Sequence, residues 1–358
     1  MPASDLSLVY TSVESVGLGM DLLSHETCSL CSVWGWMIRL AYACYFGTRV
    51  AHYMAFVGVD GYKSANLVGV VFLDMAFLVA LAVNYQLGSD GYVLRRVVNT
   101  FPEPSYWNPK TFFARTMSLI AALVWGVAIF SGVCLQNNTV AGTGLQRAFG
   151  VLFNYVNSIL VFGTFCFSMA LFAYVLYCLC FELQRYQKKL FNVFQRVPNA
   201  TVLRMVLHNF KIYRELICSV GTSLRGVVFM WFAAGTLYVL DMSMRWAFAE
   251  DGPALASAVV RTVVVVVLLF LASDLAARLR KRTDDLHELL NRVAKALRST
   301  DRDSHDVLNS FRIECFSEPL ALRLVGSWYL SRSVFYIWGV MAVATSAGAA
   351  TVFYFTVR

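Results

Sequence analysis

Four ionisable residues interrupt long apolar segments of this sequence, and they are the side chains best placed to do chemistry. Asp74 lies in the middle of one segment, Asp241 and Arg245 lie four residues apart in another, and Arg261 lies in a third. Charged groups are costly in apolar surroundings, so they usually pair with one another or face a cavity. We expect Asp74 to face a ligand cavity, with an ion pair to Arg261 as the alternative. Asp241 and Arg245 share a helical face and fit a local ion pair equally well.

Aromatic and small polar residues accompany these charges. An apolar pocket with a few polar groups is the usual composition of a small-molecule site. The candidate ligand-binding residues are Phe72, Asp74, Phe153, Asn154, Tyr155, Trp231, Tyr238 and Asp241. Each aromatic taken alone fits a hydrophobic core or a lipid-facing position as well, so the hypothesis rests on the group.

Catalytic and metal-binding motifs are absent from the sequence. It contains no Gly-x-x-x-x-Gly-Lys, Gly-x-Gly-x-x-Gly, His-Glu-x-x-His or Gly-x-Ser-x-Gly segment. Cys28 and Cys31 form a Cys-x-x-Cys pair without a second pair to complete a metal site. We therefore predict that the protein is not an enzyme and that it binds no cofactor, metal ion or nucleic acid.

The composition is that of a membrane protein. Of 358 residues, 58% are hydrophobic and 15% are charged, against roughly 25% charged residues in ordinary globular chains. This excludes a water-soluble enzyme, a disordered chain and a disulfide framework. A helix needs about 20 apolar residues to cross ~30 Å of hydrocarbon. Seven segments qualify, at 33–58, 65–87, 113–135, 149–180, 222–247, 256–277 and 327–356. They lack the alternation of barrel strands, so an all-α polytopic fold with seven transmembrane helices is predicted.

The distribution of Lys and Arg predicts the orientation. Twenty basic residues lie in the connections 88–112, 181–221 and 278–326, and three lie in the alternate connections and at the C-terminus. Basic connections stay in the cytoplasm, so the N-terminus is predicted to be cytoplasmic and the C-terminus extracellular. Asn137 then lies outside the cell in an Asn-Asn-Thr sequon, where it can be glycosylated.

The domain organisation follows from these segments. Residues 1–32 form a cytoplasmic N-terminal segment, and 33–277 contain helices one to six, with the ligand pocket in their outer half. The fourth helix is expected to continue beyond the membrane into 182–189. Apolar residues recur at helical spacing in 202–220 and 278–300, and a further short helix is expected at about 303–316. We predict that these amphipathic helices pack together in the cytoplasm. The first lies in a cytoplasmic helical loop at 181–221, and the other two form an anchor at 278–326 that precedes helix seven at 327–358.

Small and hydroxylated residues dominate the last segment. Thr345, Ser346, Gly348, Ala349 and Thr351 suit close helix packing. They equally suit a pore lining that narrows at a hydrophobic constriction. Close packing is the safer interpretation of the sequence alone.

Several local stretches resemble the insect chemoreceptor superfamily, and its gustatory receptor branch in particular. The resembling stretches are Leu207–Leu216, Val220–Leu224, Phe311–Phe316 and Gly326–Val334. The family motif in the last helix is Thr-Tyr, five hydrophobic residues, then Gln-Phe. Thr345 and Phe353 occupy its ends, while Ser346 replaces Tyr and Val352 replaces Gln.

The resemblance implies a gustatory-type chemoreceptor in the plasma membrane that acts as a ligand-gated, non-selective cation channel. It implies four subunits, identical or related, whose last helices line one pore for permeant cations within the lipid bilayer. Carried over by position, the pore and gate residues are Thr345, Ala349, Val352 and Phe353. The expected ligand is a small-molecule tastant or metabolite whose preference for the open state shifts the equilibrium.

Two other classes of protein have comparable hydropathy. A G-protein-coupled receptor needs an extracellular N-terminus, which would place the basic connections outside. A small-molecule transporter would favour repeated broken helices and clusters of intramembrane carboxylates, and the sequence shows neither.

Overall fold

The computed structural model describes residues 145–195, 200–247, 252–298, 301–316, 321–324 and 328–357, together with scattered helical positions between 40 and 130. The described helices are α6 (Leu145–Phe194), α7 (Ala200–Ser223), α8 (Arg225–Ala247), α9 (Gly252–Leu297), α10 (Arg302–Phe316) and α11 (Arg332–Val357). Within these ranges the only β-type pairing is an isolated bridge between Arg323 and Tyr329. The segment 1–32, Asp74 and Asn137 lie outside the described residues, as does most of the first three predicted spans.

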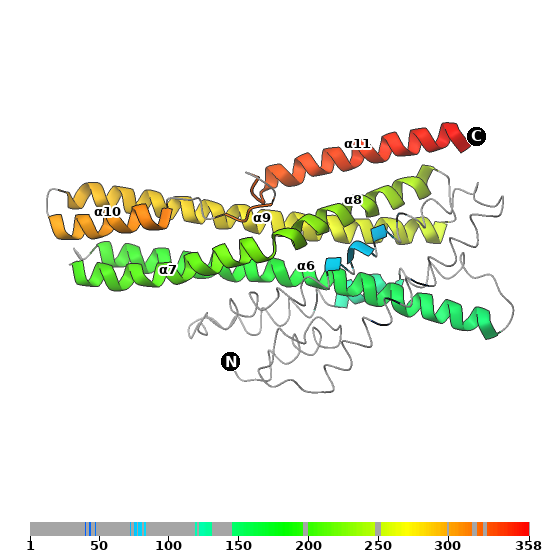
Figure 1. Cartoon of the computed structure of the whole chain (residues 1–358), viewed down its shortest axis with the longest axis horizontal. Coiled ribbons are helices and arrows are strands. Elements are labelled where there is room, and N and C mark those ends of the chain that lie inside the picture. The colour runs from blue at the N-terminus through cyan, green and yellow to red at the C-terminus, as the bar shows by residue number, and fades with distance from the viewer. Residues whose placement is uncertain are drawn as a thin grey trace.

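Four described helices have the length and apolar composition needed to cross a membrane. They are Phe165–Phe194, Arg225–Ala247, Leu255–Leu297 and Arg332–Val352. They coincide with the last four predicted spans and confirm the all-α membrane fold. In Figure 1 the end of α8, the start of α9 and the end of α11 lie at one end of the bundle, while α7 and α10 lie at the other.

Two helices are much longer than a bilayer requires. α6 has 50 residues and α9 has 46, which at 1.5 Å per residue gives about 75 Å and 69 Å. The predicted extension of the fourth span into 182–189 is confirmed. α9 likewise runs unbroken through the predicted domain boundary at 277, because apolar residues such as Leu279, Leu286 and Leu290 continue on its buried face.

The helical segments beyond the predicted membrane boundary pack together. Phe210 of α7 stacks on Phe316 of α10, with ring centroids 5.3 Å apart, and meets the edge of Phe311 at 5.7 Å. Tyr186 of α6 lies against Phe210 at 5.7 Å. Burial raises the pKa of the neighbouring Tyr213 phenol, so that group stays neutral. Within the described residues α6, α7 and α10 are therefore in contact, and their role as a cytoplasmic anchor stays a prediction.

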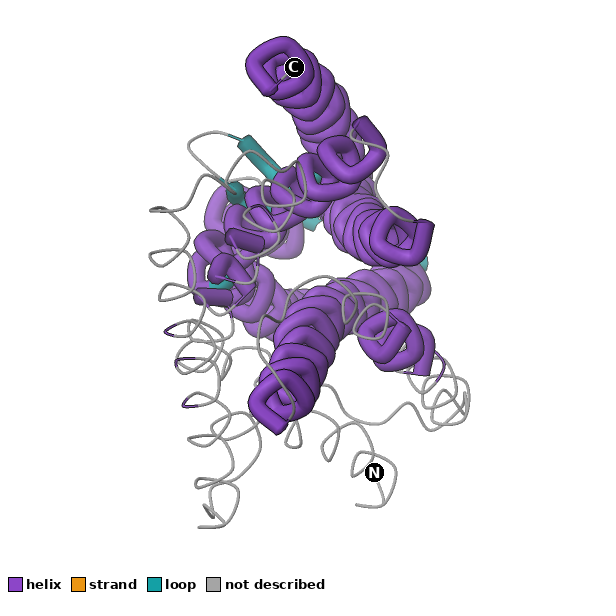
Figure 2. Tube along the Cα trace, turned by 90° about the vertical axis from the view of Figure 1, so that its right-hand side faces the viewer, coloured by secondary structure: helices purple, strands orange, loops and turns teal. Residues whose placement is uncertain are grey.

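α11 diverges from the rest of the bundle. Figure 2, viewed along the bundle, shows its C-terminal end separated from the other helices. Its described side chains are buried only at Ala342 and Ser346. Before it, Leu330 N donates to Leu322 O at 2.8 Å, and the Arg225 Nε–H group of α8 donates to Leu324 O at 2.6 Å. The start of α11 is therefore fixed to the bundle while most of its length remains exposed.

Candidate functional site

An aromatic cluster fills the space between α6 and α8. Trp231 and Tyr238 lie seven residues apart, on one face of α8, and their side chains are 1% and 0% exposed. Phe172 of α6 contacts Trp231 with ring centroids 5.0 Å apart. Phe162 meets Tyr238 edge-on at 5.7 Å, and Phe165 lies 6.0 Å from it. These two predicted ligand residues are core residues in this conformation.

A buried ionic cluster lies one turn beyond the aromatics. The Asp241 carboxylate accepts from Arg245 Nε at 2.7 Å and from Arg261 Nη2 of α9 at 3.0 Å. Arg261 Nη1 also donates to Ser257 Oγ at 2.9 Å. The side chains of Asp241, Arg245 and Arg261 are at most 3% exposed, so two guanidinium groups share one carboxylate away from solvent. The predicted local pair of Asp241 and Arg245 is confirmed, and Arg261 joins it.

The structure brings together only part of the predicted ligand site. Trp231, Tyr238 and Asp241 follow one another along the buried face of α8. Phe153, Asn154 and Tyr155 belong to α6, but their side chains lie outside the described residues. Phe72 is half-buried. The pockets whose linings the structure describes lie toward the opposite, basic end of the bundle.

The predicted pore residues lie on α11. Thr345, Ala349 and Val352 are spaced four and three residues apart and therefore share one strip of the helix. Thr345 is exposed, Ala349 is half-buried and Val352 is 61% exposed. The Phe353 side chain lies outside the described residues. Ser346, at the family's Tyr position, turns inward and donates to Ala342 O at 2.7 Å.

One contact between α8 and α11 has no counterpart among the sequence predictions. The Trp338 indole N–H donates to Phe232 O at 3.1 Å and to Thr236 Oγ1 at 3.0 Å. Gly235 lies beneath the ring, and a Cβ there would come within 2.8 Å of Trp338 Cζ2. The available signal was the single tryptophan of α11, whose indole N–H needs an acceptor where it is buried. Ser257 was also missed, although it precedes Arg261 by one helical turn.

Comparison with solved structures defines the fold. The chain superposes on the insect olfactory receptor OR5 from Machilis hrabei with a TM-score of 0.66 and 12% identity, covering 97% of this chain and 100% of that one. The structure of the same receptor in complex with eugenol gives a TM-score of 0.59 and 11% identity over 99% of both chains. No protein-family model and no curated protein matches the sequence.

The architecture is therefore that of an insect olfactory receptor, a fold in which polytopic membrane helices extend into a helical bundle. At 12% identity this agreement concerns the arrangement of the backbone. It confirms the all-α polytopic membrane fold that the sequence predicted. The gustatory branch remains a prediction from those motifs.

Proposed function

We propose that this chain is a subunit of a chemoreceptor channel that opens when a small molecule binds in the outer half of its helix bundle. The observation that carries the proposal is the exposure of α11. This helix is apolar enough to cross a membrane, yet only Ala342 and Ser346 of its described side chains are buried. An apolar helix with so little intramolecular packing suits assembly with other copies around a common axis.

The side chains on α11 support a role in conduction. Thr345 and Thr351 present hydroxyl groups in the C-terminal half of the helix, and Thr351 Oγ1 donates back to Ala347 O at 2.7 Å. Val352, on the strip with Thr345, supplies the hydrophobic constriction expected of a gate. A Val in place of the family's Gln makes this constriction apolar, so closure would proceed by dewetting.

Ligand binding is supported by the neighbouring fold and by the outer half of this chain. The Machilis hrabei receptor was solved in complex with eugenol, a small molecule. Here the aromatic cluster of Trp231 and Tyr238 adjoins α6, whose outer segment carries Phe153, Asn154 and Tyr155. A ligand that separates or reorders these helices would act on α11 through the Trp338 hydrogen bonds to α8. The proposed ligand is a small-molecule tastant or metabolite.

Orientation is the first test of the proposal. An epitope tag at the C-terminus should be labelled on intact cells, and Asn137 should carry a glycan in the same sample. A tag that antibodies reach only after permeabilisation would contradict the topology and with it the channel.

Cysteine substitution then tests the pore. Val352→Cys is expected to make currents evoked by a panel of small molecules, eugenol included, sensitive to a charged thiol reagent. Val340→Cys is the matched control, because Val340 is 71% exposed but lies on another face of α11. Equal sensitivity of the two variants would rule out Val352 as a pore-lining residue.

A further inference from the structure

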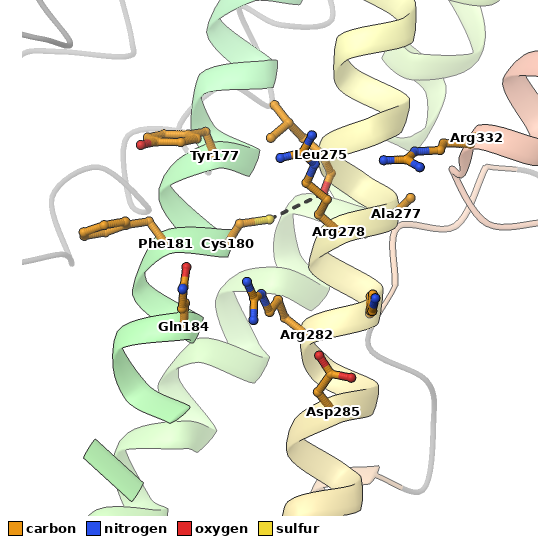
Figure 3. Close-up of a pocket in the computed structure, with 11 residues that line it drawn as sticks. Tyr177, Cys180, Phe181, Gln184, Leu275, Ala277, Arg278, Arg282, Asp285 and Arg332 are labelled. Atoms are coloured by element: carbon orange, nitrogen blue, oxygen red, sulfur yellow. Dashed lines mark hydrogen bonds between the residues drawn. The ribbon is translucent and has the colours of Figure 1, made fainter. Parts of the chain in front are cut away.

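A basic pocket lies where α6, α9 and the start of α11 meet. Its volume is about 600 Å³, and Figure 3 shows its lining. α6 contributes Tyr177, Cys180, Phe181 and Gln184, and α9 contributes most of the remainder. The two long helices are joined here, because Cys180 Sγ donates to Leu275 O at 3.4 Å. The pocket belongs neither to the predicted ligand site nor to the predicted pore.

The charge of the pocket is strongly positive. Arg278, Lys281, Arg282 and Arg332 line it, against the single lining carboxylate of Asp285. Within the described part of the chain no ion pair involves the side chains of Lys281 or Arg282. Figure 3 shows the Arg282 guanidinium reaching from α9 toward α6. This excess of positive charge suits an anionic ligand.

A buried carboxylate holds two of the arginines in place. Asp274 accepts from Arg278 Nε at 2.7 Å and from Arg332 Nε at 2.5 Å. The arginine side chains remain 63% and 53% exposed, while Asp274 is 8% exposed. Each guanidinium has five N–H donors, so both keep donors for a ligand after binding Asp274. Planar guanidinium groups match the paired oxygens of a phosphate.

The depth of the pocket matches the membrane surface. The apolar run of α9 ends at Ala272, directly before Ser273 and Asp274. From Leu275 to Asp285 the pocket then follows α9 for about 15 Å. Its apolar end carries Tyr177 and Phe181, and aromatic residues favour the boundary between hydrocarbon and headgroups. The opposite end carries Arg282 and Asp285 (Figure 3), and Lys281 also lines the pocket.

We propose that this pocket binds the phosphorylated headgroup of an anionic phospholipid from the cytoplasmic leaflet. The phosphate groups are held by Arg278, Arg282 and Arg332, with Lys281 beside them, and the acyl chains extend past Tyr177 along the apolar part of α6. Basic pockets between transmembrane helices on the cytoplasmic side are suited to such headgroups. The apolar rim favours a lipid over a free phosphate compound, although both carry the same anionic groups.

The test measures binding of a short-chain phosphatidylinositol bisphosphate to the purified full-length protein by native mass spectrometry. Each basic residue near a membrane surface contributes about 1 kcal/mol to the binding of anionic lipid. Lys281→Gln combined with Arg282→Gln should therefore weaken binding about thirtyfold. Both side chains are at least partly exposed, so the unfolding temperature should stay unchanged.

Lys295→Gln combined with Arg298→Gln is the matched control. It removes the same charge from exposed positions at the C-terminal end of α9 and directly after it, about 20 Å farther along, and should leave binding nearly unchanged. Equal weakening by both pairs would show a general charge effect and overturn the proposal. Free inositol trisphosphate binding as tightly as the lipid would also overturn it, because the site would then serve a soluble phosphate. Neither outcome would bear on whether the protein is a channel.

Discussion

Asp241 is the carboxylate that allows two arginines to be buried between α8 and α9. Asp241→Asn would leave Arg245 and Arg261 close together without a counter-charge, and should lower the unfolding free energy by about 3–5 kcal/mol. Arg261→Gln leaves a balanced pair of Asp241 and Arg245, so its cost should be smaller, about 1–3 kcal/mol.

The measurement is the unfolding midpoint of the purified protein in detergent, followed by tryptophan fluorescence. The double variant of Asp241→Asn and Arg261→Gln should be more stable than Asp241→Asn alone, since one buried cation is removed with the anion. Equal loss in both single variants would show that charge balance does not govern this cluster.

Asp301 caps the N-terminus of α10. The stability that this cap contributes depends on pH. The Asp301 carboxylate accepts from the Ser304 hydroxyl and from Ser304 N at 3.3 Å. The Ser304 hydroxyl, followed by its backbone N–H, holds the pKa of Asp301 below its ordinary value. Because the folded-state pKa is lowered, the cap contributes fully above the unfolded value of about 4 and is lost as the pH falls through the folded-state pKa.

Asp301→Ala should therefore lower the unfolding temperature at neutral pH. The difference from the parent protein should close as the pH falls through the folded-state pKa. Asp301→Asn is the matched control, since Asn also caps helices; it should keep most of the neutral-pH stability and lose the pH dependence. An unfolding-temperature difference that stays constant with pH would contradict the assignment of this cap.

At the scale of elements, Gly235 allows α8 to pack closely against α9 and α11. A Cβ at this position would lie 2.8 Å from Leu269 Cδ1 and 2.8 Å from Trp338 Cζ2. Gly235→Ala should therefore force the helices apart and cost about 1–3 kcal/mol, which thermal unfolding would measure.

Gly339→Ala provides the comparison, because a Cβ there meets nothing within 4 Å. Alanine favours a helix over glycine, so this variant should be neutral or slightly more stable. If Gly235→Ala proved equally harmless, α8 and α11 would be more loosely packed than the Trp338 contacts indicate.

The helices were predictable from the sequence because their signals are local. Apolar runs of span length identified the membrane segments of α6, α8, α9 and α11, and helical periodicity identified α7 and the C-terminal part of α9. The site was less predictable, because its contacts depend on how helices rotate against one another. Arg261 reaches Asp241 from 20 positions away, and Trp338 reaches Thr236 from 102. Neither partner follows from spacing along one helix.

For the whole molecule, the exposed length of α11 fits the proposed assembly of several chains. Val340, Met341 and Val343 are all more than half exposed, so association should cover them. We expect the protein purified in mild detergent to have a protein mass near four times 40.1 kDa by light scattering. Its unfolding temperature should also rise with protein concentration, since association stabilises by mass action.

A mass of one chain, with an unfolding temperature independent of concentration, would contradict this assembly. Detergent that covers α11 would also keep the chains apart. This effect is separated from a true lack of association by repeating the measurement after reconstitution into lipid nanodiscs. In nanodiscs, the protein mass of a channel should again be a multiple of the mass of one chain. A single chain per disc under both conditions would exclude a shared pore.

The length of α6 has a mechanical consequence. From the predicted membrane boundary at 180, α6 continues unbroken to Phe194, which is about 21 Å beyond the hydrocarbon. A tilt of this helix by about 5°, pivoting in the bilayer, would displace its far end by several ångströms. α6 would then act as a lever, with a ligand at its outer end and the packed helices at its inner end. A movement of the outer end of α6 that is too small to open a cavity there would become a larger displacement at the inner end.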